Sequence, residues 1–219
     1  YHRIDPAAAR VILVEGGPRV LPVYPPRLSA SARKQLESLG VEVRVDSAVS
    51  EVDDSGVVLA DGSRIEAGTV LWAAGVTASR LGAMLGVETD RTGRVRVGPD
   101  LSITGYPELF VIGDLAAIED VPGVAPAAIQ QGRHAGRQIA NDLAGRPRVP
   151  FRYRDKGSLA TIGRAKAVAD LRLIRFSGFT AWAAWLTIHI AYLIGFRNRL
   201  LVLISWAWNY LTFRRGARI

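Results

Sequence analysis

The sequence predicts an α/β fold of the doubly wound class, followed by a basic and apolar tail. Three observations support this prediction. Residues 11–45 show strand, helix and strand in turn, two later apolar strands at 69–75 and 109–114 end in glycine or Gly-Asp, and a long periodic helix begins at Pro126. Strands that alternate with helices are typical of a parallel sheet covered by helices on its faces.

The first elements lie within residues 11–45. Residues 11–15 (VILVE) form a short apolar run that predicts a buried strand. Ser29 or Ser31 is expected to cap a helix that stops at Gly40, and residues 41–45 then alternate as a second strand. This order is the unit from which doubly wound sheets are built.

The middle of the chain adds further strands and one long helix. Residues 48–65 predict a β-meander, because turn signals separate short strands there. The apolar runs 69–75 (TVLWAAG) and 109–114 (LFVIGD) predict buried strands. A helix is expected over Pro126 to Ala144, since proline suits its first turn and Gly145 its end.

From residue 151 the pattern changes to short basic strands, and then to two apolar runs. The strands are expected at FRYRD, SLATIG and AVADL. The apolar runs cover residues 179–195 and 200–213. The first run has 17 residues and would reach about 26 Å as a helix, short of the roughly 30 Å hydrocarbon core of a bilayer.

Charge and tryptophan are concentrated in the last third of the chain. Residues 1–150 hold 16 basic and 18 acidic residues, whereas the remainder holds 12 and 2. Four of the five tryptophans also lie in that remainder. Basic charge beside interfacial aromatics favours a membrane surface over nucleic acid as the partner. No cysteine is present, so disulfides and thiolate metal sites are excluded within the chain, and no metal site is expected.

The apolar tail therefore has two interpretations. It can form buried core helices, or a pair of helices lying in the membrane interface. The clustered tryptophans and the flanking arginines favour the interface, and monotopic attachment over spanning. These arginines are Arg197, Arg199, Arg214, Arg215 and Arg218.

Two strand ends carry candidate ligand-binding residues. An acidic residue at the end of such a strand, here Glu15, accepts hydrogen bonds from the ribose hydroxyls of a dinucleotide. Gly113 permits close backbone approach to a ligand, and Asp114 can accept hydrogen bonds from vicinal hydroxyls of a ribityl chain. Taken singly, Glu15 is better explained as a solvated loop residue, and Gly113-Asp114 as an ordinary strand-to-turn junction.

Two further features give these residues a context. Ala74 and Gly75 end a strand of small residues, as expected where a chain crosses between two nucleotide domains. The helix that starts at Pro126 presents its positive end and the N–H groups near Ala127 and Ala128, which can face the electron-accepting edge of a flavin.

These features, in this order, resemble the two-dinucleotide-binding flavoprotein reductases that share the pyridine nucleotide-disulfide reductase fold. Three segments are similar to bacterial type II NADH dehydrogenases. They are VPGVAPAAIQQGRHAGRQIANDLAG, DKGSLATIGRAKAVAD and the tail from Phe176 to Ile219. The resemblance covers essentially the whole chain, and the tail is its most specific part.

The resemblance implies parts of two Rossmann-like FAD/NAD(P)-binding domains and a C-terminal amphipathic helical membrane anchor. Residues 1–70 would form the second half of the NADH-binding domain, and residues 71–150 the C-terminal part of the FAD-binding domain. Residues 151–176 would add short strands that complete the flavin and quinone side, and residues 177–219 would form the membrane-anchoring helices. The implied cofactors are FAD and NADH. The expected partners are ubiquinone or menaquinone and an anionic membrane, at the cytoplasmic face of the bacterial cell membrane, and the formation of a homodimer stays open.

The resemblance also adds two site candidates. Family members typically read Ala-Gln-x-x-x-Gln at this helix entrance, with both glutamines near flavin and quinone. Here Pro126 follows Ala125 in place of the first glutamine, and Gln130 matches the second. Lys156 is either a cation at the flavin edge or a solvated surface lysine.

The implied activity is electron transfer from NADH through FAD to membrane quinone without proton pumping. This chain alone is expected to be inactive, because the glycine-rich turns that cradle both pyrophosphates would lie in an N-terminal half. Two alternatives stay open. One is a soluble ferredoxin or rubredoxin reductase of the same fold, and the other is a non-catalytic membrane-binding module.

Overall fold

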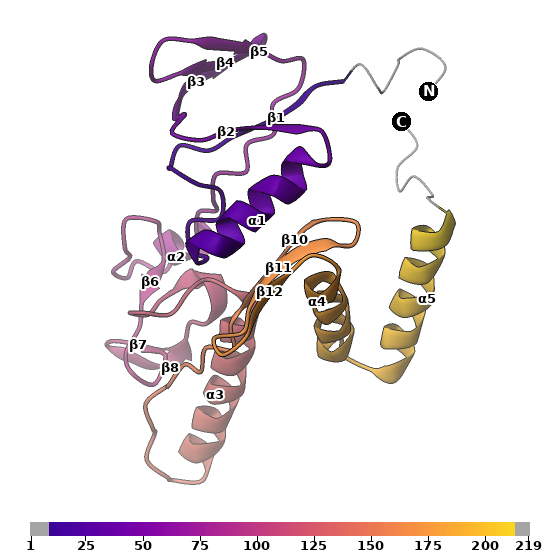
Figure 1. Cartoon of the computed structure of the whole chain (residues 1–219). Coiled ribbons are helices and arrows are strands. Elements are labelled where there is room, and N and C mark those ends of the chain that lie inside the picture. The colour runs from indigo at the N-terminus through magenta and orange to yellow at the C-terminus, as the bar shows by residue number, and fades with distance from the viewer. Residues whose placement is uncertain (1–8, 213–219) are drawn as a thin grey trace. The chain divides into compact units, whose positions relative to one another are not determined.

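The computed structural model describes residues 9–212, which form two compact units. The first unit combines the described residues up to Leu71 with those from Gly157 onward, and the second runs from Trp72 to Lys156 (Figure 1). The first unit is therefore built from two separate stretches of sequence, and the second is inserted between them.

The first unit opens with the predicted strand, helix and strand. Strand β1 (Val11–Val14) pairs in parallel with β2 (Val41–Arg44), and helix α1 (Pro26–Glu37) connects them. This confirms the α/β element order, because a parallel pair needs a crossover of this length.

The start of α1 differs from the prediction of a serine cap. The helix begins at Pro26 with Pro25 as its N-cap residue, so proline occupies the first turn, where its missing N–H costs nothing. Ser29 is buried inside the helix, and its hydroxyl donates to the carbonyl of Val20 at 2.6 Å. The serine thus fastens the preceding loop and caps nothing.

The predicted meander is present as a three-stranded antiparallel sheet. Its strands are β3 (Val49–Asp53), β4 (Gly56–Leu59) and β5 (Arg64–Glu66), in that order. The buried side chains of Val57, Leu59 and Ile65 pack against Ile12 and Val14 of β1. A second antiparallel sheet comprises β10 (Ser158–Gly163), β11 (Lys166–Asp170) and β12 (Arg175–Ser177).

Helix α1 lies between β2 and the second antiparallel sheet and joins them into one core. Its buried residues Leu28 and Ala32 share a cluster with Val43 of β2 and Val168 of β11. The side-chain amide of Gln35 also donates to the carbonyl of Ala167 at 3.2 Å. Both stretches of the first unit therefore depend on α1.

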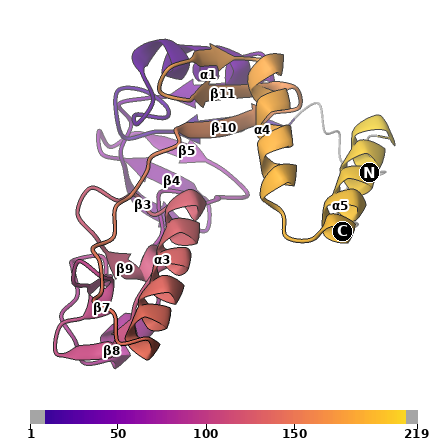
Figure 2. The ribbon, with the colours of Figure 1, turned by 90° about the horizontal axis from the view of Figure 1, so that it is seen from below.

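The tail folds as two helices, α4 (Phe179–Tyr192) and α5 (Phe196–Thr212), which form a helical hairpin (Figures 1 and 2). A single residue, Gly178, separates β12 from α4, and its φ of 79° lies in the left-handed region. Ala181 of α4 is fully buried against β11. Helix α5 contains no buried residue.

The second unit holds small sheets and one long helix. Its elements are α2 (Leu81–Met84), β6 (Val95–Arg96), β7 (Ser102–Ile103), β8 (Tyr106–Phe110), the 3-10 turn η2 (Gly113–Leu115), β9 (Ala116–Ala117) and α3 (Ala125–Leu143). The core contains Val95, Ile103, Val111 and Ala116. The long helix confirms the prediction for Pro126 to Ala144 within one residue at each end.

Three predicted strands are corrected by the structure. Residues 69–75 form no strand, since no strand of the described chain pairs with them, and Leu71 is 87% and Trp72 66% exposed. The strand expected at 109–114 ends at Phe110, because its hairpin with β7 ends there and the chain turns at Gly113. Residues 151–155 form no strand either, since the N–H of Phe151 donates to the carbonyl of Pro99 and the backbone of Arg154 pairs with the Gln130 side chain of α3.

Candidate functional site

Glu15 lies where the sequence places it, directly after β1 at the carboxyl end of the parallel pair. Its backbone N–H donates to the carbonyl of Arg44 at 2.8 Å and so continues the ladder. Its half-buried carboxylate accepts the N–H of Gly17 at 2.8 Å. A Cβ atom at Gly17 would stand 3.3 Å from that carboxylate oxygen, so a small residue suits the turn that orients Glu15.

Gly113 and Asp114 form the turn that follows β8. Gly113 has a φ of 71°, a conformation that favours glycine. Asp114 is exposed, and its carboxylate lies beside Gly123. The N–H of Gly113 donates to the side-chain oxygen of Gln131, which is 2% exposed. A hydrogen bond to α3 therefore holds the turn in place, while the Asp114 carboxylate stays accessible to a ligand.

The N-terminal end of α3 comes next to this turn. Val124 is the N-cap residue and makes no side-chain cap. The N–H groups of Ala127 and Ala128 donate to the carbonyl of Val124, at 2.9 and 3.1 Å, and Pro126 has no N–H. The N–H groups of both alanines are thus used inside the helix, so what this end offers a ligand is the positive end of the helix dipole.

Gln130 pairs with the backbone of a single residue. Its side-chain oxygen accepts the N–H of Arg154 at 3.0 Å, and its side-chain nitrogen donates to the carbonyl of the same residue at 3.0 Å. The nitrogen also donates to the carbonyl of Pro126 at 3.1 Å. Gln130 thereby replaces a neighbouring strand and holds the segment that leads to the exposed Lys156.

The same segment is fastened twice more along α3. The fully buried Gln138 accepts the N–H of Val149 at 2.9 Å. His134, 3% exposed, packs edge-on against Phe151 with ring centroids 5.4 Å apart. Burial lowers the pKa of His134 below its ordinary value, and the charge of Arg137 acts in the same direction. This histidine is therefore a neutral core residue near pH 7.

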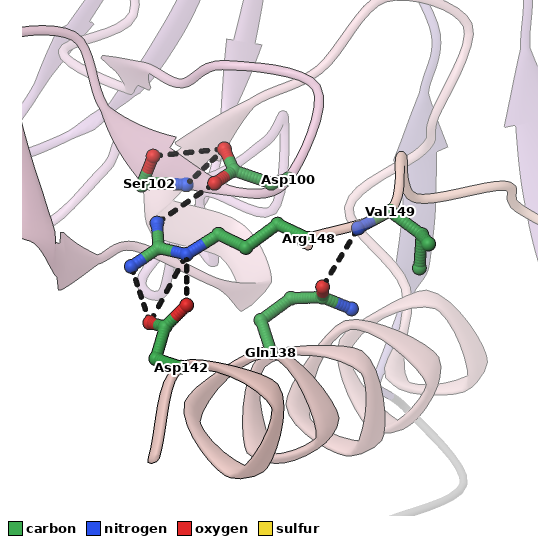
Figure 3. A network of polar contacts seen from close by, with 6 residues as sticks. All are labelled: Asp100, Ser102, Gln138, Asp142, Arg148 and Val149. Carbon is green, nitrogen blue, oxygen red and sulfur yellow. Dashed lines mark hydrogen bonds and ion pairs between the residues drawn. The ribbon is translucent and has the colours of Figure 1, made fainter. Parts of the chain in front are cut away.

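An ion-pair network fixes the turn between α3 and this segment (Figure 3). The guanidinium of Arg148 donates to Asp142 of α3 and to Asp100 before β7, each at 2.8 Å, and lies 4.7 Å from the ring centroid of Phe110. Burial opposes ionisation of Asp100, but the hydrogen bonds from Arg148 and Ser102 keep its pKa below the usual range. The two carboxylates raise the pKa of Arg148 above its ordinary value.

The second unit thus brings together Gly113, Asp114, Gln130 and the start of α3, while Glu15 belongs to the first unit. Ala74 and Gly75 are exposed and outside any strand. An accessible carboxylate, a glycine without a side chain and a positive helix end suit the polyhydroxy chain and anionic edge of a flavin. The residues present therefore fit FAD.

Sequence reasoning missed Gln131, Gln138 and Arg148, which hold this site in shape. Spacing was the available signal: the buried Gln131 and Gln138 lie two helical turns apart on one face of α3. Polar residues on the inner face of a helix indicate that irregular backbone must be satisfied there. Among the described residues, no group of three or more histidines and carboxylates is placed to hold a metal ion.

Within residues 9–212, no helix is both long and apolar enough to cross a membrane. Helix α4 carries apolar side chains on all its sides, so it lacks the distinct polar face of an amphipathic helix.

Comparison with known proteins identifies the family. The family model for pyridine nucleotide-disulphide oxidoreductases matches residues 4–132, and the model for the NDH2 C-terminal domain matches residues 156–215. Two type II NADH:quinone oxidoreductases of Mycobacterium tuberculosis, Ndh and NdhA, are 47% and 43% identical to this chain over 99% of its length. The chain spans about half of each relative, 49% in both cases.

A solved structure supports the same fold. NDH2 from Plasmodium falciparum, determined in complex with NADH, superposes with a TM-score of 0.83 over 95% of this chain and 59% of that one, at 16% identity. At this identity the likeness concerns the fold alone, and the family rests on the sequence matches. The chain belongs to the pyridine nucleotide-disulphide oxidoreductase family and, within it, to the type II NADH:quinone oxidoreductases.

Proposed function

We propose that the full-length protein is an FAD-dependent NADH:quinone oxidoreductase that does not pump protons. The observation that carries this proposal is the presence of both family models in one chain, the second of which describes the NDH2 C-terminal domain. The two mycobacterial relatives bear the name of this activity. A soluble ferredoxin or rubredoxin reductase needs no such C-terminal domain, so it is the weaker alternative.

The site geometry suggests how the residues divide the work. Glu15, held by Gly17, is proposed to accept hydrogen bonds from the ribose of NADH. Asp114 is proposed to bind the ribityl hydroxyls of FAD, with Gly113 allowing close approach. Bound FAD supplies the hydride and electron chemistry, and the protein binds and orients the partners.

The remaining candidates take positioning roles in this proposal. The start of α3, at Ala127 and Ala128, faces its positive end toward the flavin, and Ala74-Gly75 marks the crossing between nucleotide domains. Gln130 acts on the quinone side by fixing the Arg154 backbone, and with it the approach to Lys156. The domain boundaries at residues 70, 150 and 176 belong to the same proposal.

Helices α4 and α5 are proposed to attach the protein peripherally to the cytoplasmic face of the bacterial membrane. Large apolar side chains on α5 are open to solvent, with Phe196 at 80% and Leu211 at 75% exposure. Such a surface is costly in water and favourable in a bilayer interface. Arg197 and Arg199 at the start of α5 suit anionic lipid, whereas Arg214, Arg215 and Arg218 lie outside the described residues.

One comparison tests activity and attachment together. The full-length protein and a variant lacking residues 177–219 are each assayed for NADH oxidation with a soluble artificial acceptor, for reduction of long-chain quinone in liposomes, and for sedimentation with the liposomes. We expect the truncated enzyme to keep the first activity, to lose most of the second and to remain in the supernatant. Undiminished quinone reduction in liposomes by the truncated enzyme would contradict the role of the tail.

The spectrum of the full-length protein tests the non-catalytic alternative. A flavoprotein absorbs in the visible region and bleaches when NADH reduces it. A purified protein without flavin, which takes up none from added FAD, would favour a membrane-binding module instead. Whether the full-length protein forms a homodimer is answered by the mass of the detergent-solubilised protein.

A further inference from the structure

We propose that a hollow between α4, α5 and β10 seats one acyl chain of an anionic membrane phospholipid, an inference that rests on the proposed membrane attachment. The hollow has a volume of about 650 Å³ and lies entirely within the first unit. This volume falls in the range of roughly 300 to 1,000 Å³ that is typical of sites for small molecules.

Aromatic pairs and one arginine give the hollow its shape. Trp185 and Trp206 stack with centroids 5.5 Å apart, and Trp182 lies 5.2 Å from Tyr210, so that both pairs bridge α4 and α5. At the end of α5, Arg164 donates to the carbonyl of Tyr210 at 2.6 Å and lies 4.4 Å from its ring centroid. Rigid rings therefore hold α5 beside the sheet.

The lining of the hollow is mostly apolar, with Thr161, Arg164 and Asn209 as its polar members. Besides the three tryptophans, it includes Leu186 of α4 and Leu203, Ala207 and Leu211 of α5. Water binds poorly in such a space, because an ordered water needs two to four polar partners. A flexible hydrocarbon chain gains free energy there by leaving water and by filling the contacts between the rings.

The hollow continues into the surface that is proposed to meet the membrane. Leu211 lines the hollow and is itself 75% exposed, and Trp208 on the neighbouring side of α5 is also exposed. A lipid chain can therefore enter from the bilayer along α5 without crossing a polar barrier.

Charge selects the phospholipid over the other occupants. From residue 157 to the end of the chain there is one acidic residue, Asp170, against nine basic ones, and Asp170 already pairs with Arg175. Arg164 stands at the hollow itself. A phosphate head group is attracted to this charge, whereas a second copy of the chain brings the same positive charge and a quinone ring is neutral.

The test uses full-length, FAD-loaded protein. It is incubated with vesicles of phosphatidylglycerol and phosphatidylcholine, extracted into lipid-free detergent, and analysed by native mass spectrometry. Wild type is expected to retain one phosphatidylglycerol per protomer. Ala207→Trp, which fills the hollow, should lower the retained lipid at least fivefold, and the matched control Ser205→Trp, outside the lining, should retain it. Flavin content and binding to vesicles should be equal in all three proteins.

If Ala207→Trp loses flavin, Leu203→Trp replaces it, and quenching of tryptophan fluorescence in wild type by dibromostearoyl phosphatidylglycerol gives an independent measure. Retained quinone in place of lipid, or equal lipid retention by Ala207→Trp and Ser205→Trp, would overturn the proposed lipid site in the hollow. So would a wild-type protein that binds vesicles but retains no lipid, and this result leaves the attachment intact. A wild type that does not bind vesicles refutes the attachment itself.

Discussion

Replacing Gln131 by leucine tests whether α3 controls the Gly113-Asp114 turn. The side-chain oxygen of Gln131 accepts the N–H of Gly113, and Gln131 is 2% exposed. Leucine has a similar size but no acceptor, so the half-buried Gly113 N–H loses its partner. A fully buried donor left without a partner costs about 1–3 kcal/mol, and this half-buried donor is expected at the lower end of that range. A cost of about 1 kcal/mol corresponds to a roughly fivefold shift in the equilibrium between the closed and the open turn.

The assay is hydrogen exchange followed by mass spectrometry on the full-length protein, combined with a titration of FAD. Gln131→Leu should speed exchange in the peptide that contains Gly113 and weaken FAD binding by a similar factor, because Asp114 is displaced with the turn. Gln130→Leu is the matched control. It removes the bonds to Arg154, so it should speed exchange around residues 152–156 and leave the Gly113 peptide unchanged.

The reasoning fails if both variants speed exchange in the same peptides, since the two neighbouring amides would then act through general loosening of α3. It also fails if Gln131→Leu leaves exchange at Gly113 and FAD affinity unchanged.

Three further predictions concern single side chains. The pKa of His134 is lowered in the folded state, so below about pH 6.5 the unfolded state binds a proton more readily than the folded state does. The stability that neutral His134 contributes is therefore present above about pH 6.5 and is lost as the pH falls through the folded pKa. The urea midpoint of His134→Gln should drop less between about pH 7 and 5 than that of wild type. Glu15→Gln should narrow the preference for NADH over NADPH, and an unchanged ratio of kcat/KM values for the two nucleotides would remove Glu15 from the ribose. Asp114→Ala should lower FAD affinity by one to two orders of magnitude, and full flavin occupancy at limiting FAD would reject that placement.

The regular elements of this chain could be predicted because local signals agree with the fold. The strands at 11–14 and 41–44, the meander and the helix at 125–143 all show the expected period, and turn residues bound them. The predicted serine cap of α1 was wrong, because the hydroxyl of Ser29 donates to the carbonyl of Val20 in the preceding loop instead of capping the helix. Sequence shows that a hydroxyl is available but not which backbone group it meets.

The misassigned strands share another physical cause. An apolar run becomes a strand only if a neighbour satisfies its hydrogen bonds, and periodicity carries no information about that neighbour. Residues 69–75 have no pairing strand among the described residues, and Arg154 is paired by a helix side chain. Gln130 was identified from the family motif at the start of the helix, and that motif carries no information about the pairing of its side chain with the backbone of Arg154.

The single glycine between β12 and α4 has a mechanical consequence. Gly178 adopts a φ of 79°, its N–H donates to the carbonyl of Ala167, and its carbonyl accepts the N–H of Trp182. With no slack on either side, the direction of α4 is coupled to the direction of the sheet. In the proposed attachment to a bilayer, a tilt of α4 would therefore rotate the sheet of β10, β11 and β12 with it, and Gly178 is the residue at which the two directions are coupled. Any other residue at this position would be strained in that torsion.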